Sequence, residues 1–164
     1  MHFFCIFAGV KILPGMNESF VIQSDIANLP YVEERVFHFC HECHVGNYYS
    51  TVSVAALQAA ANAIVHGNGS DASKTVTVTL GTCRGGVFVE VEDQGTGFRF
   101  DDFGTLESLE KGSGIFVMKS LADRMCYSDG GRVVRMEFDI AGIDPADALE
   151  RAAVLQSHFA PVAA

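Results

Sequence analysis

The chain has 164 residues, of which 49% are apolar, and 20 Asp and Glu against 11 Lys and Arg give a net charge of −9. This length fits one domain with its own core. The acidic balance argues against binding to nucleic acid or to an anionic membrane, because both need a cationic face. No apolar run approaches the roughly 18 residues that cross a bilayer, so we expect a cytoplasmic protein with a protein or small-molecule partner.

Residues 1–15 stand apart from the rest of the chain. Phe3 to Val10 are apolar, but no basic segment precedes them and no clear cleavage site follows, which makes a signal peptide the weaker alternative. We interpret this stretch as an N-terminal extension, or as a start site placed too early. The domain itself is expected at 16–140, and a tail helix that begins near a capping Asp144 is expected within 141–164.

The first elements are a short strand and a helix. Ser19 to Gln23 form the predicted strand, and Asn28 is expected to cap the helix, with Pro30 in its first turn. One face of this helix carries apolar residues at helical spacing: Val32, Val36, Phe39, Cys40 and Cys43. The helix therefore packs on the domain through this stripe.

The same helix contains a C-x-x-C-H pattern, Cys40 to His44, which is the attachment pattern for c-type haem. His38 and Cys5 are further potential zinc ligands. Haem attachment needs an exported chain, however, and zinc needs four converging ligands. Both cysteines have a plainer role as small buried hydrophobes, so haem or metal binding through Cys40, Cys43 and His44 is a remote alternative. The five cysteines indicate reduced thiols.

An alanine-rich stretch from Val52 to His66 predicts a second helix, which ends at Gly67 as a C-cap. Gln58 and Asn62 are four residues apart and therefore point from the same face, with His66 a further turn along. Polar amides among so many alanines either face solvent or line a site, and the pattern alone does not decide between these.

A hairpin follows, from a strand over Lys74 to Leu80 through Gly85 and Gly86 into Val87 to Glu92. Asp93 comes where the second strand ends. Gly95 and Gly97 follow it and allow a tight turn and the close approach of a ligand.

Gly112, Ser113 and Gly114 open a third helix, whose predicted apolar face is Ile115, Met118, Leu121, Ala122 and Met125. A glycine-flanked helix N-terminus presents free N–H groups and the positive end of the helix dipole, which suits phosphate. The carboxylate of Asp93 suits the edge of a nucleotide base. Together with this helix end, it predicts a nucleotide pocket.

After a turn at Asp129 to Gly131, a last strand carries the predicted buried set Val134, Met136, Phe138 and Ile140. The order is strand, helix, helix, hairpin, loop, helix and strand. It predicts an α/β (α+β) fold, a two-layer sandwich in which helices cover one face of a mixed β-sheet.

Three segments resemble the N, G1 and G2 boxes of the GHKL (Bergerat-fold, histidine kinase-like) ATPases: Gln58 to Asn68, Asp93 to Phe98 and Gly112 to Asp123. The wording N-A-I-V-H-G and G-I-F-V-M-K-S-L-A-D is similar to that of the bacterial anti-sigma-factor serine/threonine kinases. The resemblance spans roughly Ser19 to Phe138.

The resemblance implies a role for each matching residue. Asn62 would hold Mg²⁺ at the phosphates of ATP, and Asp93 would bind the adenine amino group while the backbone of Gly95 and Gly97 approaches the base. The residues that would complete the cofactor site are His66 and, around the phosphates, Gly112, Gly114 and the N–H of Ile115. Residues 98–111 would form the lid. The implied partners are a sigma factor and an antagonist (anti-anti-sigma) protein, bound by a homodimer.

Two positions depart from the family pattern. Gln58 stands where the general-base glutamate is usual, and an amide cannot accept a proton; a general base typically contributes about 10² to 10⁴ in rate. Ser113 stands where many relatives have arginine. We expect ATP binding with weak phosphotransfer. The alternatives are a working kinase, in which an acid such as Glu92 substitutes or none is needed, and a nucleotide-gated protein-binding switch without kinase activity.

Overall fold

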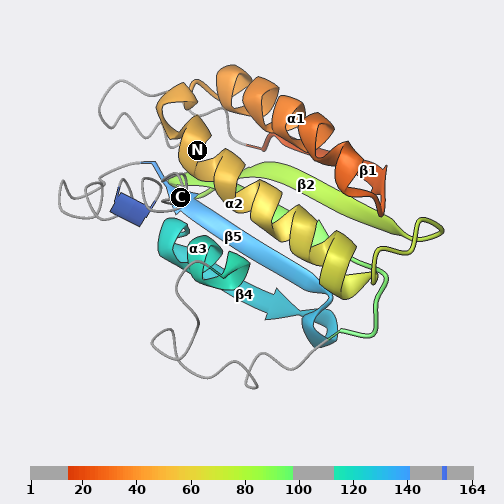
Figure 1. Ribbon diagram of the computed structural model, residues 1–164. Coiled ribbons are helices and arrows are strands. Elements are labelled where there is room, and N and C mark those ends of the chain that lie inside the picture. Colours follow the sequence, from red (N-terminus) through yellow and green to blue (C-terminus); the bar gives the residue numbers. More distant parts are fainter. Residues whose placement is uncertain (1–14, 98–112, 141–152, 155–164) are drawn as a thin grey trace, which may run out of the picture.

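The computed structural model describes residues 15–97, 113–140 and 153–154, which form a two-layer sandwich (Figure 1). Helices α1, α2 and α3 cover one face of a sheet of five strands in the order β1-β2-β3-β5-β4. The two-layer α/β fold expected from the sequence is therefore confirmed. The predicted lid, Gly112 and nearly all of the tail helix lie outside the described residues; Ala153 and Val154 are helical, and Val154 packs against the core.

Every strand pairing in the described sheet is antiparallel, so the prediction of a mixed sheet was wrong. The strand bounds are β1 Asn17–Gln23, β2 Thr75–Cys83, β3 Gly86–Glu92, β4 Arg124–Ser128 and β5 Val133–Asp139. A single helix between β3 and β5 would make these two strands parallel. Strand β4, which the sequence pattern did not predict, adds one more reversal of the chain and turns β5 antiparallel to β3.

Strand β4 begins within the stretch that the sequence predicts as the third helix. Helix α3 spans Gly114–Leu121 and does not reach Met125, because Ala122 has left the helical conformation with ψ 142°. Met125 and Tyr127 are half-buried and alternate with exposed neighbours, which is strand periodicity. Leu121 and Met125 are four residues apart, and this spacing imitates a continuing helical face.

Helix α1, Leu29–Glu42, buries the predicted stripe, and Cys43 directly after it is buried as well. Asn28 takes the N-cap position, but its side chain does not cap the helix; its Nδ2 donates to Gln23 O at 3.1 Å. Asp25 provides a cap instead, because it accepts from the N–H of Ala27 at 2.9 Å and so begins the short 3₁₀ turn before α1.

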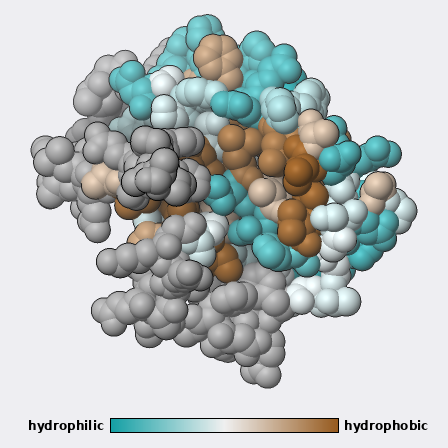
Figure 2. All heavy atoms as spheres, viewed as in Figure 1, coloured by the Kyte–Doolittle hydropathy of each residue, from teal (hydrophilic) through white to brown (hydrophobic). Residues whose placement is uncertain are grey.

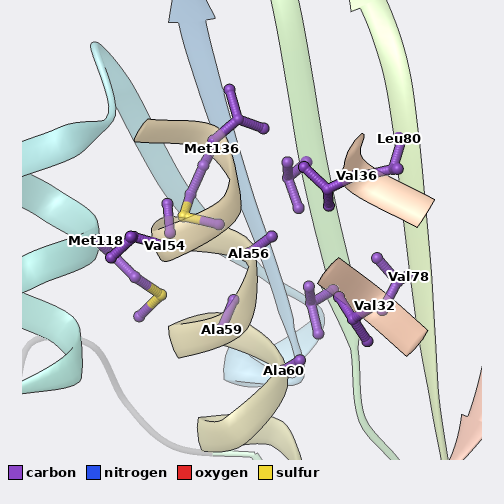
Figure 3. Packing of buried hydrophobic residues seen from close by; sticks show 14 of the residues in the cluster. Val32, Val36, Val54, Ala56, Ala59, Ala60, Val78, Leu80, Met118 and Met136 are labelled. Carbon is purple, nitrogen blue, oxygen red and sulfur yellow. The ribbon is translucent and has the colours of Figure 1, made fainter. Parts of the chain in front are cut away.

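Helix α2, Tyr49–Asn62, is the central helix of the outer layer and packs against both α1 and α3. Its buried residues are mostly alanines, which let neighbouring elements approach closely (Figure 3). In that view, α2 lies between Met118 of α3 and Val32 and Val36 of α1.

The end of α2 is wound more widely, as a π-helical turn over Ala63–Gly67. The N–H of Asn68 donates to Ala63 O at 2.8 Å, five residues back, instead of the four of an α-helix. The chain therefore passes from helix to loop one residue later than a regular helix would, and this displaces Gly67 and Asn68 around the helix axis.

The two outer surfaces of the sandwich differ. On the helical side, Figure 2 shows apolar residues near the middle of the face with hydrophilic residues around them. The far side of the sheet carries charged side chains. Arg124 forms an ion pair with Asp139 through two hydrogen bonds of 2.9 and 2.7 Å, and the guanidinium carbon of Arg135 lies over the ring of Phe88, 3.6 Å from its centre. In the described part of the chain, no helix has the length and apolar character to cross a membrane.

Candidate functional site

A cavity of about 350 Å³ lies between α2, α3 and the sheet. Its lining residues come from α2 and the π-helical turn after it, the end of β3 and the turn that follows, the start of α3, and β4 and β5 with the turn between them: Ala59, Asn62, Ala63, His66, Gly67, Val91, Asp93, Thr96, Gly97, Ser113, Gly114, Ile115, Met118, Tyr127, Gly131, Arg132 and Val134. Apolar side chains make up much of its wall, and a few polar groups are placed among them, as is usual for a small-molecule site.

Asp93 is the buried carboxylate of this cavity, with 8% of its surface exposed. Its Oδ1 accepts from the N–H of Gly95 at 2.8 Å, and its own N–H donates to Arg132 O at 3.0 Å. Burial raises the pKa of Asp93, while the Gly95 N–H and the charge of Arg132 act in the opposite direction. An ionised carboxylate has about four acceptor sites, so Asp93 can also accept a hydrogen bond from an amino group in the cavity.

Glycines bring the end of α2 into backbone contact with the turn after β3. A Cβ on Gly67 would overlap the carboxylate of Asp93, and a Cβ on Gly95 would overlap the carbonyl oxygen of Gly67. Gly97 has φ 76°, and a Cβ there would overlap the carbonyl oxygen of Gly130. At Gly95 and Gly97 a Cβ would meet backbone atoms, and at Gly67 it would displace the Asp93 carboxylate. The close approach encloses Asp93.

Where α2 meets α3, the side chains of Gln58 and Asn62 lie against Gly114. A Cβ on Gly114 would come within 2.8 Å of Gln58 Oε1 and within 3.1 Å of both polar atoms of the Asn62 amide. Ser113 caps the helix, since its Oγ accepts from the N–H of Phe116 at 3.2 Å. An amide oxygen thus stands beside a helix N-terminus. This donor set fits a phosphate together with a hard cation such as Mg²⁺.

Most of the predicted site residues therefore lie in the wall of one cavity: Asn62, His66, Asp93, Gly97, Gly114 and Ile115. Gln58 and Gly95 pack directly behind Gly114 and Asp93, respectively. Gly112 lies outside the described residues. The assigned roles stay predictions, but the residues that they concern are brought together by the fold.

Tyr127 and Arg132 also line the cavity, and the sequence analysis missed both. Tyr127 comes from the overlooked strand β4, and burial raises its pKa to about 12, which keeps the phenol neutral. Arg132 lies opposite Asp93, and its guanidinium donates to Asp129. The register in which Glu92 faces Val133 places Arg132 there, so correct pairing of the last hairpin would have found it.

The C-x-x-C-H segment has no part in this cavity. Cys40 and Cys43 are buried in the core with 1% and 0% exposure. Burial raises the pKa of Cys40 to about 12 and that of Cys43 to about 11, so both thiols are protonated. Among the described residues, no three His, Cys, Asp or Glu side chains gather as metal ligands. The two cysteines pack in the core as small apolar residues.

Comparison with protein families agrees with this geometry. The family model of the histidine kinase-like ATPase domain matches residues 38–138, a range that contains every residue of the cavity wall. No curated protein matches the chain.

Proposed function

Because the chain belongs to the histidine kinase-like ATPase family, we propose that it binds Mg·ATP in this cavity as a regulatory protein of the anti-sigma-factor serine kinase type. The observation that supports this proposal is the division of one cavity into two chemically different ends. Asp93 lies where α2 meets the turn after β3, and Asn62 lies where α2 meets the N-terminus of α3. A nucleotide needs both a base site and a phosphate site.

At the base end, Asp93 accepts a hydrogen bond from the amino group of adenine, and the apolar side chains of Val91, Met118 and Val134 contact the ring. At the phosphate end, the N–H groups at the start of α3 donate to phosphate oxygens. The amide oxygen of Asn62 would hold Mg²⁺ beside the phosphates. Bound Mg²⁺ neutralises phosphate charge.

Gln58 is the reason to propose weak phosphotransfer. Its amide lies beside Asn62 and Gly114, at the position of the family's general base, but it cannot take up a proton. Binding of Mg·ATP is kept. Because phosphoryl transfer depends mostly on positioning and charge neutralisation, loss of the base lowers its rate by a factor of about 10² to 10⁴, which is what a general base typically contributes. The same observation favours a second candidate function, a nucleotide-gated protein-binding switch without kinase activity.

The proposed partners are a sigma factor and an antagonist protein with a phosphorylatable serine, both bound by a homodimer. The wording of the segments Asn62 to Gly67 and Gly114 to Asp123, which is similar to that of the anti-sigma-factor kinases, supports this assignment. The net charge of −9 agrees with a protein partner.

The test combines calorimetric titration of Mg·ATP with an assay of ADP formation, with and without candidate antagonist protein. The variants are Gln58→Glu and, as a matched control, Gln23→Glu at an exposed position on β1. Binding with turnover gained only in Gln58→Glu would identify a protein that has lost its base. Equal turnover in the wild type and Gln58→Glu would identify a working kinase. Absence of ATP binding by the wild type would overturn the proposal.

A further inference from the structure

Asn68, directly after the π-helical turn, is a buried polar residue for which the proposed ATP site gives no role. Its side chain is 3% exposed. Nδ2 donates to Thr75 O at 2.9 Å, and Oδ1 accepts from the N–H of Gln94 at 2.7 Å. One side chain therefore joins the end of α2 to the start of β2 and to the turn after β3.

Gln94 makes the complementary contact. Its Oε1 accepts from the N–H of Thr75 at 2.8 Å, so both backbone polar groups of Thr75 are bonded to side chains of this cluster. The buried Asn68 amide is bonded to backbone groups of two other segments. These bonds fix the relative positions of the three segments, because an unmade bond would leave a polar atom of this buried amide without a partner.

These bonds determine where Asp93 points. The peptide group between Asp93 and Gln94 is held by the bond from Gln94 N–H to Asn68, and the peptide before Asp93 is held by the bond to Arg132 O. With the backbone fixed on both sides and Gly95 N–H bonded to Oδ1, the carboxylate has a set direction before any ligand arrives.

We infer that Asn68 is a positioning residue for the base site and that it sets the preference for a purine with an amino group at C6 over one with a carbonyl group there. This inference rests on the proposed function. A rigid acceptor rejects a base that presents a second acceptor, because neither group can turn to relieve the mismatch. Without the Asn68 bond, the turn moves, and Asp93 no longer discriminates between the two bases.

The experiment measures the dissociation constants of Mg·ATP and of the inosine analogue Mg·ITP for the full chain, at a temperature where each variant is folded. Asn68→Ala removes both bonds. Asn68→Asp keeps an acceptor for Gln94 N–H and loses the donor to Thr75 O. Asn28→Ala is the matched control, since Asn28 also donates from Nδ2 to a backbone carbonyl, at 3.1 Å, but away from the cavity.

We expect the wild type and Asn28→Ala to prefer ATP by about tenfold to a hundredfold, the range for a hydrogen bond to a charged acceptor. In Asn68→Ala the ratio of the dissociation constants of Mg·ITP and Mg·ATP falls to within about threefold of one, while the affinity for Mg·ITP changes little. Asn68→Asp keeps most of the preference. If Asn68 had a merely structural role, its loss would weaken the binding of both nucleotides in parallel and leave the ratio of their dissociation constants unchanged.

An unchanged ratio in folded Asn68→Ala would therefore overturn the inference, as would loss of the ratio in Asn28→Ala. If Asn68→Ala does not fold, Gln94→Ala decides, because Gln94 is exposed and its side chain holds the same turn to Thr75; it should lower the ratio at least threefold, and an unchanged ratio overturns the inference. A wild type that binds neither nucleotide would instead refute the proposed function.

Discussion

The α-carbon of Gly114 packs against the amide of Gln58, so that an added Cβ would lie 2.8 Å from Oε1. The nearest atoms belong to the far ends of flexible side chains, Gln58 and Asn62, and these can move at little cost. We expect Gly114→Ala to change the free energy of unfolding by less than about 1 kcal/mol, the scale of the helix preference of alanine over glycine.

The same substitution should reduce the affinity for Mg·ATP by at least about tenfold, because the displaced Asn62 amide is the proposed Mg²⁺ ligand. Calorimetry and chemical denaturation measure the two effects separately. Gly46→Ala is the control, since nothing lies within 4 Å of a Cβ at that position. Equal ATP affinity in Gly114→Ala and the wild type would remove Asn62 from the phosphate site.

Asp93→Asn tests a conflict between stability and binding. Burial raises the pKa of Asp93, so the folded state holds the proton more tightly than the unfolded state. The contribution of this group to stability is therefore greatest below its ordinary pKa and falls as the pH rises through the raised value. At pH 7 the charged side chain destabilises the fold, and replacing it with the neutral amide removes that penalty.

We expect Asp93→Asn to be as stable as the wild type or more stable at pH 7, and to lose that advantage at pH 3. Its affinity for ATP should fall by about tenfold to a hundredfold, the effect of replacing a charged acceptor. Urea denaturation at both pH values, with nucleotide titration at pH 7, provides the measurement. A variant that is less stable at pH 7 than at pH 3, relative to the wild type, would contradict the assignment.

The cysteines should differ sharply in reactivity. Cys126 is exposed and Cys83 is half-buried, while the pKa values of Cys40 and Cys43, about 12 and about 11, leave almost no thiolate at pH 8. Iodoacetamide at pH 8 should label Cys126 first and Cys83 more slowly. Cys40 and Cys43 should react only after unfolding.

Mass spectrometry of labelled peptides over time follows each of these four cysteines, and the urea-denatured protein serves as the control in which the four react at similar rates. Rapid native labelling of Cys40 would show that the C-x-x-C-H segment is accessible, and it would reopen the question of a ligand there.

The sequence predicted those parts of the fold in which burial follows a simple local period. Val32, Val36 and Phe39 recur at helical spacing and are buried, and Val76 and Val78 alternate as a half-buried strand requires. Strand β4 was missed because five residues are too few to separate one period from another when Met125 also continues the face of α3. Its pairing with β5 is a tertiary property.

The candidate site likewise has residues that the sequence predicts and residues that only the fold brings to the cavity. Asp93, Asn62 and Gly114 stand in short motifs that resemble the boxes of the GHKL ATPases, so the sequence predicts them as site residues before any fold is known. Arg132 and Tyr127 reach the cavity through strand register, and Asn68 acts through partners 7 and 26 residues away. No local pattern contains such information, since it depends on which backbone groups are left to be bonded after folding.

The wide turn at Ala63–Gly67 holds one residue more than an α-helical turn between Ala63 O and the N–H of Asn68. Deletion of one residue inside it, for example the exposed Val65, would leave Asn68 four residues after Ala63, which is the spacing of an ordinary α-helical hydrogen bond. Asn68 would then keep its place above Ala63, whereas the residues inside the turn, His66 among them, would shift around the helix axis. The stretch can therefore lose a residue without losing the hydrogen bonds of Asn68.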